Sequence, residues 1–160
     1  MTKGILNYTT TVEAAKTISE IQSVLQSHGA RSILMTYAQN GEVEALAFEV
    51  DTPHSRVPIR LPVNVDAVVK ILKRQRDNSP RLKYRTQTDD EILRMRQQAI
   101  RVAWRILKDW VEAQMALLET EMVKLEQIFL PYVETPNGQT VFERLQGQQF
   151  LQLPEGERRP

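Results

Sequence analysis

The sequence predicts an α+β fold in which an α-β-β-β-α unit, with a three-stranded antiparallel sheet, is followed by a long C-terminal amphipathic helix. Two patterns predict this fold. Apolar residues recur at helical spacing over 11–28 and 88–131, whereas they alternate with other residues over 32–37 and 45–50. The chain has 160 residues, of which 41% are hydrophobic and 26% charged, and these values are typical of a globular domain with a core of its own.

The first two helices are predicted from their end signals. Thr10-Thr11-Val12-Glu13 has the Thr-x-x-Glu form of a capping box, and Gly29 is placed to end a helix over about 11–28 in a left-handed conformation. A second helix to about residue 75 is expected to begin at Asn64, a good N-cap residue, with Asp66 favourably placed near the positive end of the helix.

The three strands are predicted between these helices. Asn40-Gly41 lies between two alternating segments and favours a hairpin with a type I′ turn, which needs positive φ at both residues. The third strand, over 56–61, contains Pro58, which cannot donate a ladder hydrogen bond. This strand is therefore expected at an edge of the sheet.

The long helix is predicted to begin at Thr88-Asp89-Asp90-Glu91, a second capping-box pattern, because no proline or glycine follows until Pro131. Its apolar residues form two stripes, although a helix that rests on one sheet needs only one. We expect a second copy of the chain to cover the other stripe, and a break near Thr120 that folds the helix back is the alternative. The residues predicted for the oligomer interface are Trp104, Trp110, Leu118 and Met122.

These elements predict the following organisation of the chain. Residues 1–76 form the α-β-β-β-α domain, 77–87 a basic linker, and 88–131 a long helix that packs on the domain, on a partner subunit or on both. A short C-terminal element over 132–145 precedes a disordered tail over 146–160.

Several functional classes are disfavoured by the composition. The absence of cysteine excludes disulfides and thiol catalysis, and two histidines without suitably spaced carboxylates predict no metal site. No glycine-rich phosphate loop occurs, and the cluster Asp51, His54 and Ser55 is explained by turn chemistry. We therefore expect no catalytic residue, no cofactor and no membrane segment, in a non-enzymatic cytoplasmic protein.

The most suggestive feature is a concentration of positive charge. The net charge of the chain is +1, but residues 70–108 hold 12 basic and 4 acidic residues. Four of the basic residues recur at helical spacing and predict a stripe that tracks phosphates, while a solvated helix face with a basic linker explains the charges equally well. The predicted anion-binding residues are Lys70, Lys73, Arg74, Arg76, Arg81, Lys83, Arg85 and the stripe Arg94, Arg101, Arg105 and Lys108. Tyr84 lies among them and is placed to stack on a base.

Four stretches of the chain carry a resemblance to a known group of proteins. They are GILNYTT at 4–10, RLPVNVDAV at 60–68, VAWRILKDWVEAQM at 102–115 and LPY at 130–132. In these stretches the chain resembles short uncharacterised proteins encoded by phages, prophages and related mobile elements. The resemblance implies a bacterial or archaeal host, and it implies no activity and no site residues.

Two functions are compatible with these patterns. The first is a phage or mobile-element accessory protein, homo-oligomeric, that binds an anionic partner such as DNA or RNA through the basic stretch. The alternative is an inhibitor of host defence that captures a nucleotide signal or docks on a host protein, with Arg56 and Arg60 as candidates for a signal pocket. A small enzyme would need a cluster of polar groups that converge in a cleft.

Overall fold

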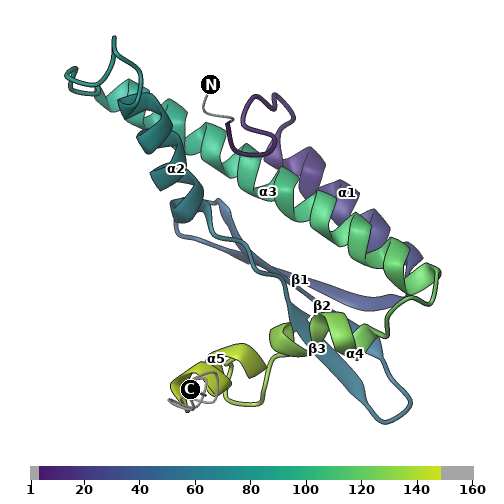
Figure 1. Ribbon diagram of the computed structural model, residues 1–160. Coiled ribbons are helices and arrows are strands. Elements are labelled where there is room, and N and C mark those ends of the chain that lie inside the picture. The colour runs from purple at the N-terminus through teal and green to yellow at the C-terminus, as the bar shows by residue number, and fades with distance from the viewer. Residues whose placement is uncertain (1–3, 149–160) are drawn as a thin grey trace, which may run out of the picture. The chain divides into compact units, whose positions relative to one another are not determined.

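The structure, a computed structural model, describes residues 4–148 and divides into two units (Figure 1). The helical unit comprises Met1–Gly29 and Pro62–Thr120, and the sheet unit comprises Ala30–Leu61 and Glu121–Pro160. Each unit therefore combines two separate stretches of the chain. The predicted α+β arrangement of a helix, a three-stranded antiparallel sheet and a long later helix is confirmed.

The helical unit consists of α1 (Ala14–Ser27), α2 (Val65–Asp77) and α3 (Asp89–Glu119). Both α1 and α2 pack on α3, which is the central helix of this unit (Figure 1). The buried apolar side chains include Ile18, Ile21 and Leu25 of α1, Val68 of α2, and Ala99, Val102, Trp104, Leu107 and Val111 of α3. Periodicity predicted the buried side of α1. In α3, however, residues of both predicted apolar stripes are buried within the chain itself.

Two of the predicted N-terminal caps are confirmed. The Asn64 side chain accepts a hydrogen bond from the Ala67 N–H at 3.0 Å, and Thr88 and Glu91 form a reciprocal capping box at the start of α3. Gly29 has a φ of +92° just after α1, as predicted.

The predicted capping box at the start of α1 is wrong. The N-cap residue is Glu13, which makes no side-chain cap hydrogen bond, while the Thr10 hydroxyl accepts from the Val12 N–H at 3.3 Å. The Gln98 side chain of α3 donates to the carbonyls of Tyr8 and Thr10 at 3.0 and 2.9 Å. These contacts hold the segment ahead of α1 against α3, so tertiary packing moves the start of the helix beyond the local motif.

The sheet unit contains β1 (Ala30–Tyr37), β2 (Val43–Asp51) and β3 (Arg56–Arg60) in the order β1-β2-β3, with both pairs antiparallel. Leu46, Phe48 and Val50 of β2 alternate with less buried residues, so one face of the central strand is buried. The edge position predicted for β3 from Pro58 is confirmed.

The β1–β2 connection differs from the predicted type I′ turn. Gly41 has a φ of +82°, but Asn40 is not among the described residues with positive φ. The Gly41 N–H donates to the Ala38 carbonyl at 2.9 Å, and the Ala38 N–H donates to the Glu42 carbonyl at 2.9 Å. This is the longer hairpin loop in which a turn of ordinary hand is followed by a left-handed glycine, and it needs only one residue with positive φ.

The helix predicted over 88–131 is not continuous, because α3 ends at Glu119. The Thr120 hydroxyl donates to the Ala116 carbonyl at 2.9 Å, and Glu121 adopts a left-handed φ of +56°. The alternative of a break near Thr120 is therefore the one that occurs. The chain continues through α4 (Leu125–Phe129), a 3-10 turn η1 (Leu130–Tyr132) and α5 (Val141–Gly147).

The C-terminal segment completes the sheet unit. The Glu134 N–H donates to the Pro58 carbonyl at 2.9 Å, and Val133 forms an antiparallel bridge with Ile59 of β3. The Phe129 ring packs edge-on against Phe48, with ring centroids 5.7 Å apart. Of the predicted disordered tail, residues 146 and 147 belong to α5, and residues 149–160 lie outside the described residues.

Candidate functional site

The predicted phosphate stripe on α3 is largely occupied by carboxylates of the same unit. Arg101 Nη2 lies 3.0 Å from Glu13 Oε1, and Arg105 Nη1 lies 2.6 Å from Glu20 Oε2. Lys108 Nζ lies 2.7 Å from Glu112 Oε1 and 3.9 Å from Glu20 Oε2. Glu13 is the N-cap residue of α1 and Glu20 belongs to that helix, so these cations join α1 to α3. The prediction that they form an open phosphate-tracking stripe is therefore corrected.

Arg76 and Arg85 support the turn between α2 and α3. The Arg76 side chain is 12% exposed and donates to the Arg85 carbonyl at 2.7 Å and to Asp77 at 3.0 Å. Arg85 in turn donates to Glu91, which belongs to the capping box of α3. The backbone N–H of Thr88, together with Arg85 and Arg76, holds the pKa of Glu91 below its ordinary value of 4.5. The turn is therefore tied to both helices that it connects.

The segment predicted as a linker is a hydrogen-bonded turn. The N–H groups of Leu82 and Lys83 both donate to the Ser79 carbonyl at 3.0 Å, and the Arg85 N–H donates to the Leu82 carbonyl at 3.1 Å. In Figure 1 this turn is the teal loop that joins α2 to α3.

Five other predicted cations stay exposed on α2 and on this turn. Lys70, Lys73 and Arg74 are exposed at helical i, i+3 and i+4 spacing, which places them on one face of α2. Arg81 and Lys83 are exposed on the turn. Among residues 4–148, none of the five forms an ion pair. We call these five residues, Lys70, Lys73, Arg74, Arg81 and Lys83, the basic surface.

The neighbouring acids do not neutralise the basic surface. On the same side of α2, Asp66 lies 3.0 Å from Arg96, and Asp77 lies 3.0 Å from Arg76. Tyr84, 88% exposed, has the Lys83 ammonium 5.4 Å from its ring centroid. Tyr84 therefore adds an exposed aromatic ring beside the basic surface. Arg94, the remaining member of the predicted stripe, is exposed on the first part of α3.

Arg56 and Arg60 of the sheet unit, the candidates for a signal pocket, bind carboxylates instead. Arg56 Nε lies 3.1 Å from Asp51, which also accepts from Arg31 at 2.6 Å, and Arg60 lies 2.7 Å from Glu143. Hydrogen bonds from Arg31 and Arg56 hold the pKa of Asp51 below its ordinary value of 3.8. These pairs lie on exposed parts of the unit, so they do not present two cations to an enclosed ligand.

The residues near Asp51 form a turn. The Thr52 hydroxyl donates to the Ser55 carbonyl at 2.7 Å and accepts from the N–H groups of His54 and Ser55. These are the hydrogen bonds of a turn, as the sequence predicted for this segment, and the Asp51 carboxylate is engaged by two arginines.

The predicted oligomer interface is not a single surface of one helix. Trp104 is fully buried within its own chain, so it is a core residue and the prediction that it contacts a second copy is corrected. Trp110 and Leu118 are partly buried on α3, whereas Met122, 71% exposed, lies beyond the end of that helix.

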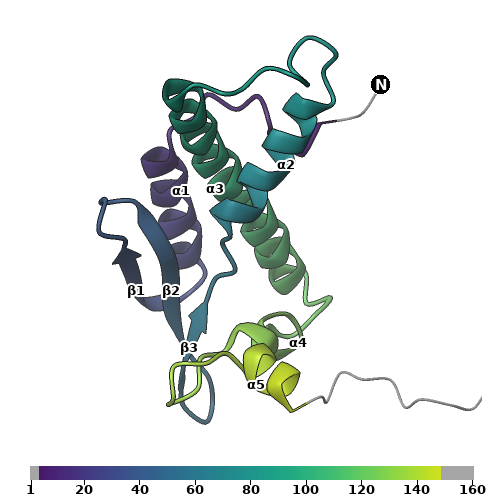
Figure 2. The same cartoon turned by 90° about the vertical axis from the view of Figure 1, so that its left-hand side faces the viewer.

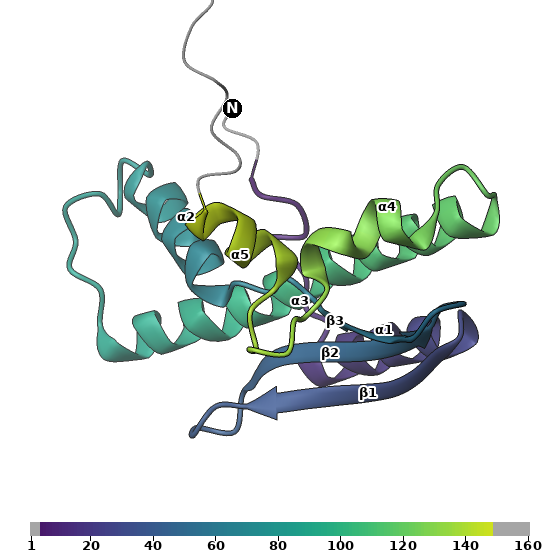
Figure 3. The same ribbon diagram turned by 90° about the horizontal axis from the view of Figure 1, so that it is seen from below.

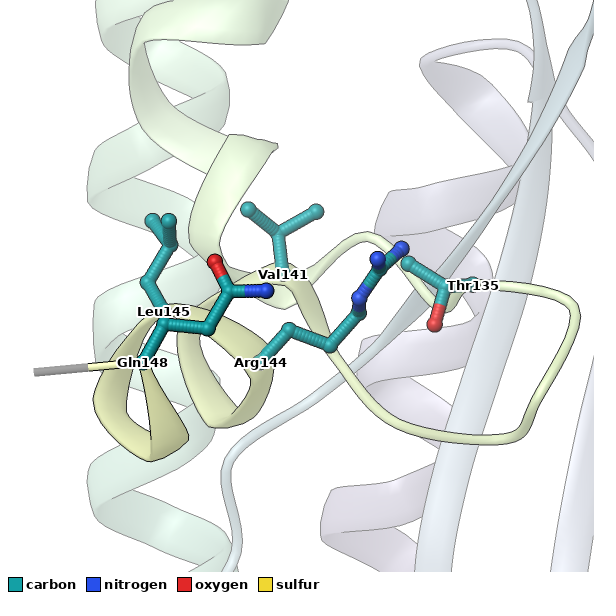
Figure 4. Close-up of a pocket in the computed structure, with 5 residues that line it drawn as sticks. All are labelled: Thr135, Val141, Arg144, Leu145 and Gln148. Atoms are coloured by element: carbon teal, nitrogen blue, oxygen red, sulfur yellow. The ribbon is translucent and has the colours of Figure 1, made fainter. Parts of the chain in front are cut away.

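The sheet unit also has a pocket of about 180 Å³ that sequence reasoning did not predict (Figure 4). It is lined by Thr135, Val141, Arg144, Leu145 and Gln148. Figure 4 shows the Arg144 and Thr135 side chains on the same side of this pocket. No sequence motif marks these positions, because the pocket arises from the packing of α5 beside the preceding turn.

Comparisons with known proteins place no further constraint on the site. No protein-family model, no curated protein and no solved structure matches the chain significantly. Within residues 4–148, no helix has the length and apolar character that a membrane crossing requires.

Proposed function

We propose that this protein is a non-enzymatic nucleic-acid-binding protein that uses the basic surface on α2 and on the turn that follows it. One observation carries the proposal: Arg101, Arg105 and Lys108 of α3 are engaged by carboxylates of the chain, whereas the five cations of the basic surface are exposed without ion pairs among the described residues. Unpaired lysines and arginines bind phosphates by releasing counterions, which supplies affinity without sequence recognition. The resemblance to phage and mobile-element proteins is compatible with this role.

Tyr84 favours single strands over duplexes as the ligand. A base stacks on an aromatic ring only when it is unpaired, and Tyr84 is the most exposed of the exposed large apolar side chains. The Lys83 ammonium lies 5.4 Å from the centroid of this ring, so a strand whose phosphates contact Lys83 would bring a base close to Tyr84.

The experiment is a fluorescence-anisotropy titration of the full chain with single-stranded RNA, single-stranded DNA and duplex DNA at two salt concentrations. Substitutions Lys73→Gln, Arg74→Gln and Arg81→Gln are each expected to weaken binding and to reduce the slope of log affinity against log salt by about 0.7 on single strands. Lys16→Gln is the matched control, because Lys16 is an exposed lysine of α1, which carries no residue of the basic surface. Absence of salt-dependent binding to every probe would overturn the proposal.

A second pair of variants tests the aromatic contribution. Tyr84→Ala is expected to weaken single-strand binding by about tenfold, because the stacking of one base contributes roughly 1–3 kcal/mol, whereas Tyr84→Phe keeps the ring and the affinity. Equal binding of Tyr84→Ala and the unchanged chain would remove Tyr84 from the site while leaving the phosphate contacts in place.

A further inference from the structure

The pocket of the sheet unit lies between one face of α5 and the turn that precedes it. Four of its lining residues, Val141, Arg144, Leu145 and Gln148, recur at i, i+3, i+4 and i+7, the spacing of residues that share one helix face. A helix face with this spacing is usually apolar, because it packs on its own domain. Here an arginine and a glutamine stand at two of the four positions, where packing alone needs apolar side chains.

Both walls of the pocket are held in place by hydrogen bonds. The Thr135 N–H donates to the Gln139 carbonyl at 2.8 Å and closes the turn. Thr140 and Glu143 form a reciprocal capping box at the start of α5. The segment ahead of the turn bridges to β3, and Figures 2 and 3 both show the connection between α4 and α5 passing beside this strand. A ligand would therefore bind to a pocket whose backbone is already ordered.

Arg144 brings to the pocket a positive charge that the described part of the chain does not neutralise. Its side chain is exposed and forms no ion pair with any of residues 4–148. The adjacent acid, Glu143, instead lies 2.7 Å from Arg60 Nη2 and accepts from the Thr140 N–H at 2.7 Å. Of the described residues that line the pocket, Arg144 alone carries a charge. One negative charge on a ligand would balance it.

Arg144 and Gln148 supply hydrogen-bond donors to the pocket. The side-chain amide of Gln148 has no hydrogen-bond partner among residues 4–148, so its N–H groups can donate to a ligand. Figure 4 shows the Arg144 guanidinium and the Gln148 amide projecting from the same side of α5. The Thr135 hydroxyl adds no donor, because it already donates to the Gln139 carbonyl at 2.6 Å. A ligand with several acceptor oxygens fits this set of groups.

We propose that this pocket binds a small organic monocarboxylate with an apolar body. The planar guanidinium of Arg144 pairs with the two carboxylate oxygens, and the Gln148 amide donates to one of them. Val141 and Leu145, both partly buried, contact the apolar body. The pocket volume of about 180 Å³ is close to that of a cavity of about 150 Å³ that holds benzene, so the body is the size of one such ring.

The lining favours a carboxylate over a phosphate compound. A phosphate monoester carries a charge of about −1.5 to −2 at pH 7, whereas the pocket offers one cation. Inorganic phosphate, in addition, has no apolar surface to cover Val141 and Leu145. The pocket is also separate from the basic surface, because the two belong to different units of the chain. The proposal therefore does not depend on nucleic-acid binding.

An NMR titration of the full chain with benzoate, followed through backbone amide signals, tests the proposal. Benzoate is expected to shift the signals of residues 135–148 saturably, with a dissociation constant in the millimolar range or below. Benzyl alcohol keeps the ring without the charge, and acetate keeps the carboxylate without the ring. Each is expected to bind about tenfold more weakly or worse, because each lacks one of the two contacts. Inorganic phosphate is expected to bind more weakly than benzoate.

Substitutions at Arg144 separate its role from general attraction of anions. Arg144→Gln is expected to weaken benzoate binding by about tenfold or more, because it removes a charge-assisted hydrogen bond. Arg144→Lys keeps the charge without the planar fork and should cause a smaller loss. Arg94→Gln is the matched control, the same change at an exposed arginine of α3 in the other unit. The spectra of the unliganded variants show that each keeps the fold.

Three results would each overturn the proposal. The first is the absence of saturable shifts with benzoate at residues 135–148. The second is binding of benzyl alcohol or inorganic phosphate as tight as that of benzoate. The third is equal affinity of Arg144→Gln and Arg94→Gln for benzoate.

Discussion

Arg105 Nη1 and Glu20 Oε2 lie 2.6 Å apart and join α3 to α1 through side chains that are 23% and 33% exposed. Lys108 lies 3.9 Å from the same carboxylate oxygen, so one acid serves two cations. Glu20→Gln is expected to lower the free energy of unfolding by about 1 kcal/mol, the upper range for a partly exposed ion pair. Urea denaturation measures this effect.

The matched control for Glu20→Gln is Glu44→Gln, the same change at an exposed position of β2. It is expected to leave the unfolding midpoint unchanged. If Glu20→Gln also left the unfolding midpoint unchanged, the ion pairs of Arg105 and Lys108 with Glu20 would not contribute to the packing of α1 on α3.

The Thr-x-x-Glu sequences that begin at Thr88 and Thr10 are expected to respond differently to the same substitution. Thr88→Ala removes the acceptor for the Glu91 N–H at the start of α3 and should cost about 1 kcal/mol of stability. Thr10→Ala removes only a 3.3 Å contact with the Val12 N–H outside α1 and should cost much less. Chemical denaturation of the two variants side by side checks this, and equal losses would contradict the cap assignment at Glu13.

Replacing Thr17 with an apolar residue is expected to maintain or increase the stability of the protein. Its hydroxyl is fully buried and has no hydrogen-bond partner among the described residues. Thr17→Val keeps the shape and removes the polar atom, so the free energy of unfolding should stay constant or rise by about 1 kcal/mol. Thr17→Ser, which keeps the hydroxyl and opens a methyl-sized void, should instead lower the thermal midpoint. A marked loss in Thr17→Val would show that the hydroxyl is satisfied in solution.

The sheet unit is expected to lose stability in acid through Glu143. The Thr140 N–H, followed by Arg60, holds the pKa of Glu143 below its ordinary value of 4.5. A carboxyl with a lowered pKa contributes stability that is complete above its ordinary value and is lost as the pH falls through the lowered one. Glu143→Gln should therefore flatten the pH dependence of unfolding below about pH 4.5 while lowering stability at neutral pH. If Glu143→Gln left the pH dependence of unfolding in acid unchanged, Glu143 would not be the source of the acid sensitivity.

Periodicity and end signals predicted most of the elements. The alternation in β2 and the helical spacing of Ile18, Ile21 and Leu25 correspond to buried faces, because burial repeats with the geometry of each element. The end of α3 was predicted only as the alternative of a break near Thr120, because Glu121 adopts a left-handed conformation without glycine. Such a conformation has no reliable sequence signal in a residue with a long side chain.

The charges were harder to interpret than the core. Spacing placed Arg101 and Arg105 on one stripe of α3, but spacing within one helix does not reveal what faces it. Glu13 and Glu20 are seven residues apart in the first predicted helix, which is the one available signal that a complementary acidic stripe existed. The spacing of these two acids is informative only if α1 is known to pack on α3. That packing is a tertiary contact between segments far apart in the chain, which the sequence pattern does not reveal.

The hydrogen bond from Arg76 to the Arg85 carbonyl holds the turn between α2 and α3 in place, and this affects how a partner would bind there. The main chain there is ordered before an encounter, so docking immobilises only long side chains and leaves the backbone entropy largely unchanged. A partner that binds this turn would therefore meet an ordered backbone, and its binding would not be coupled to folding of the turn. Its temperature dependence should accordingly be shallow, and most of its sensitivity should lie in the ionic composition of the medium.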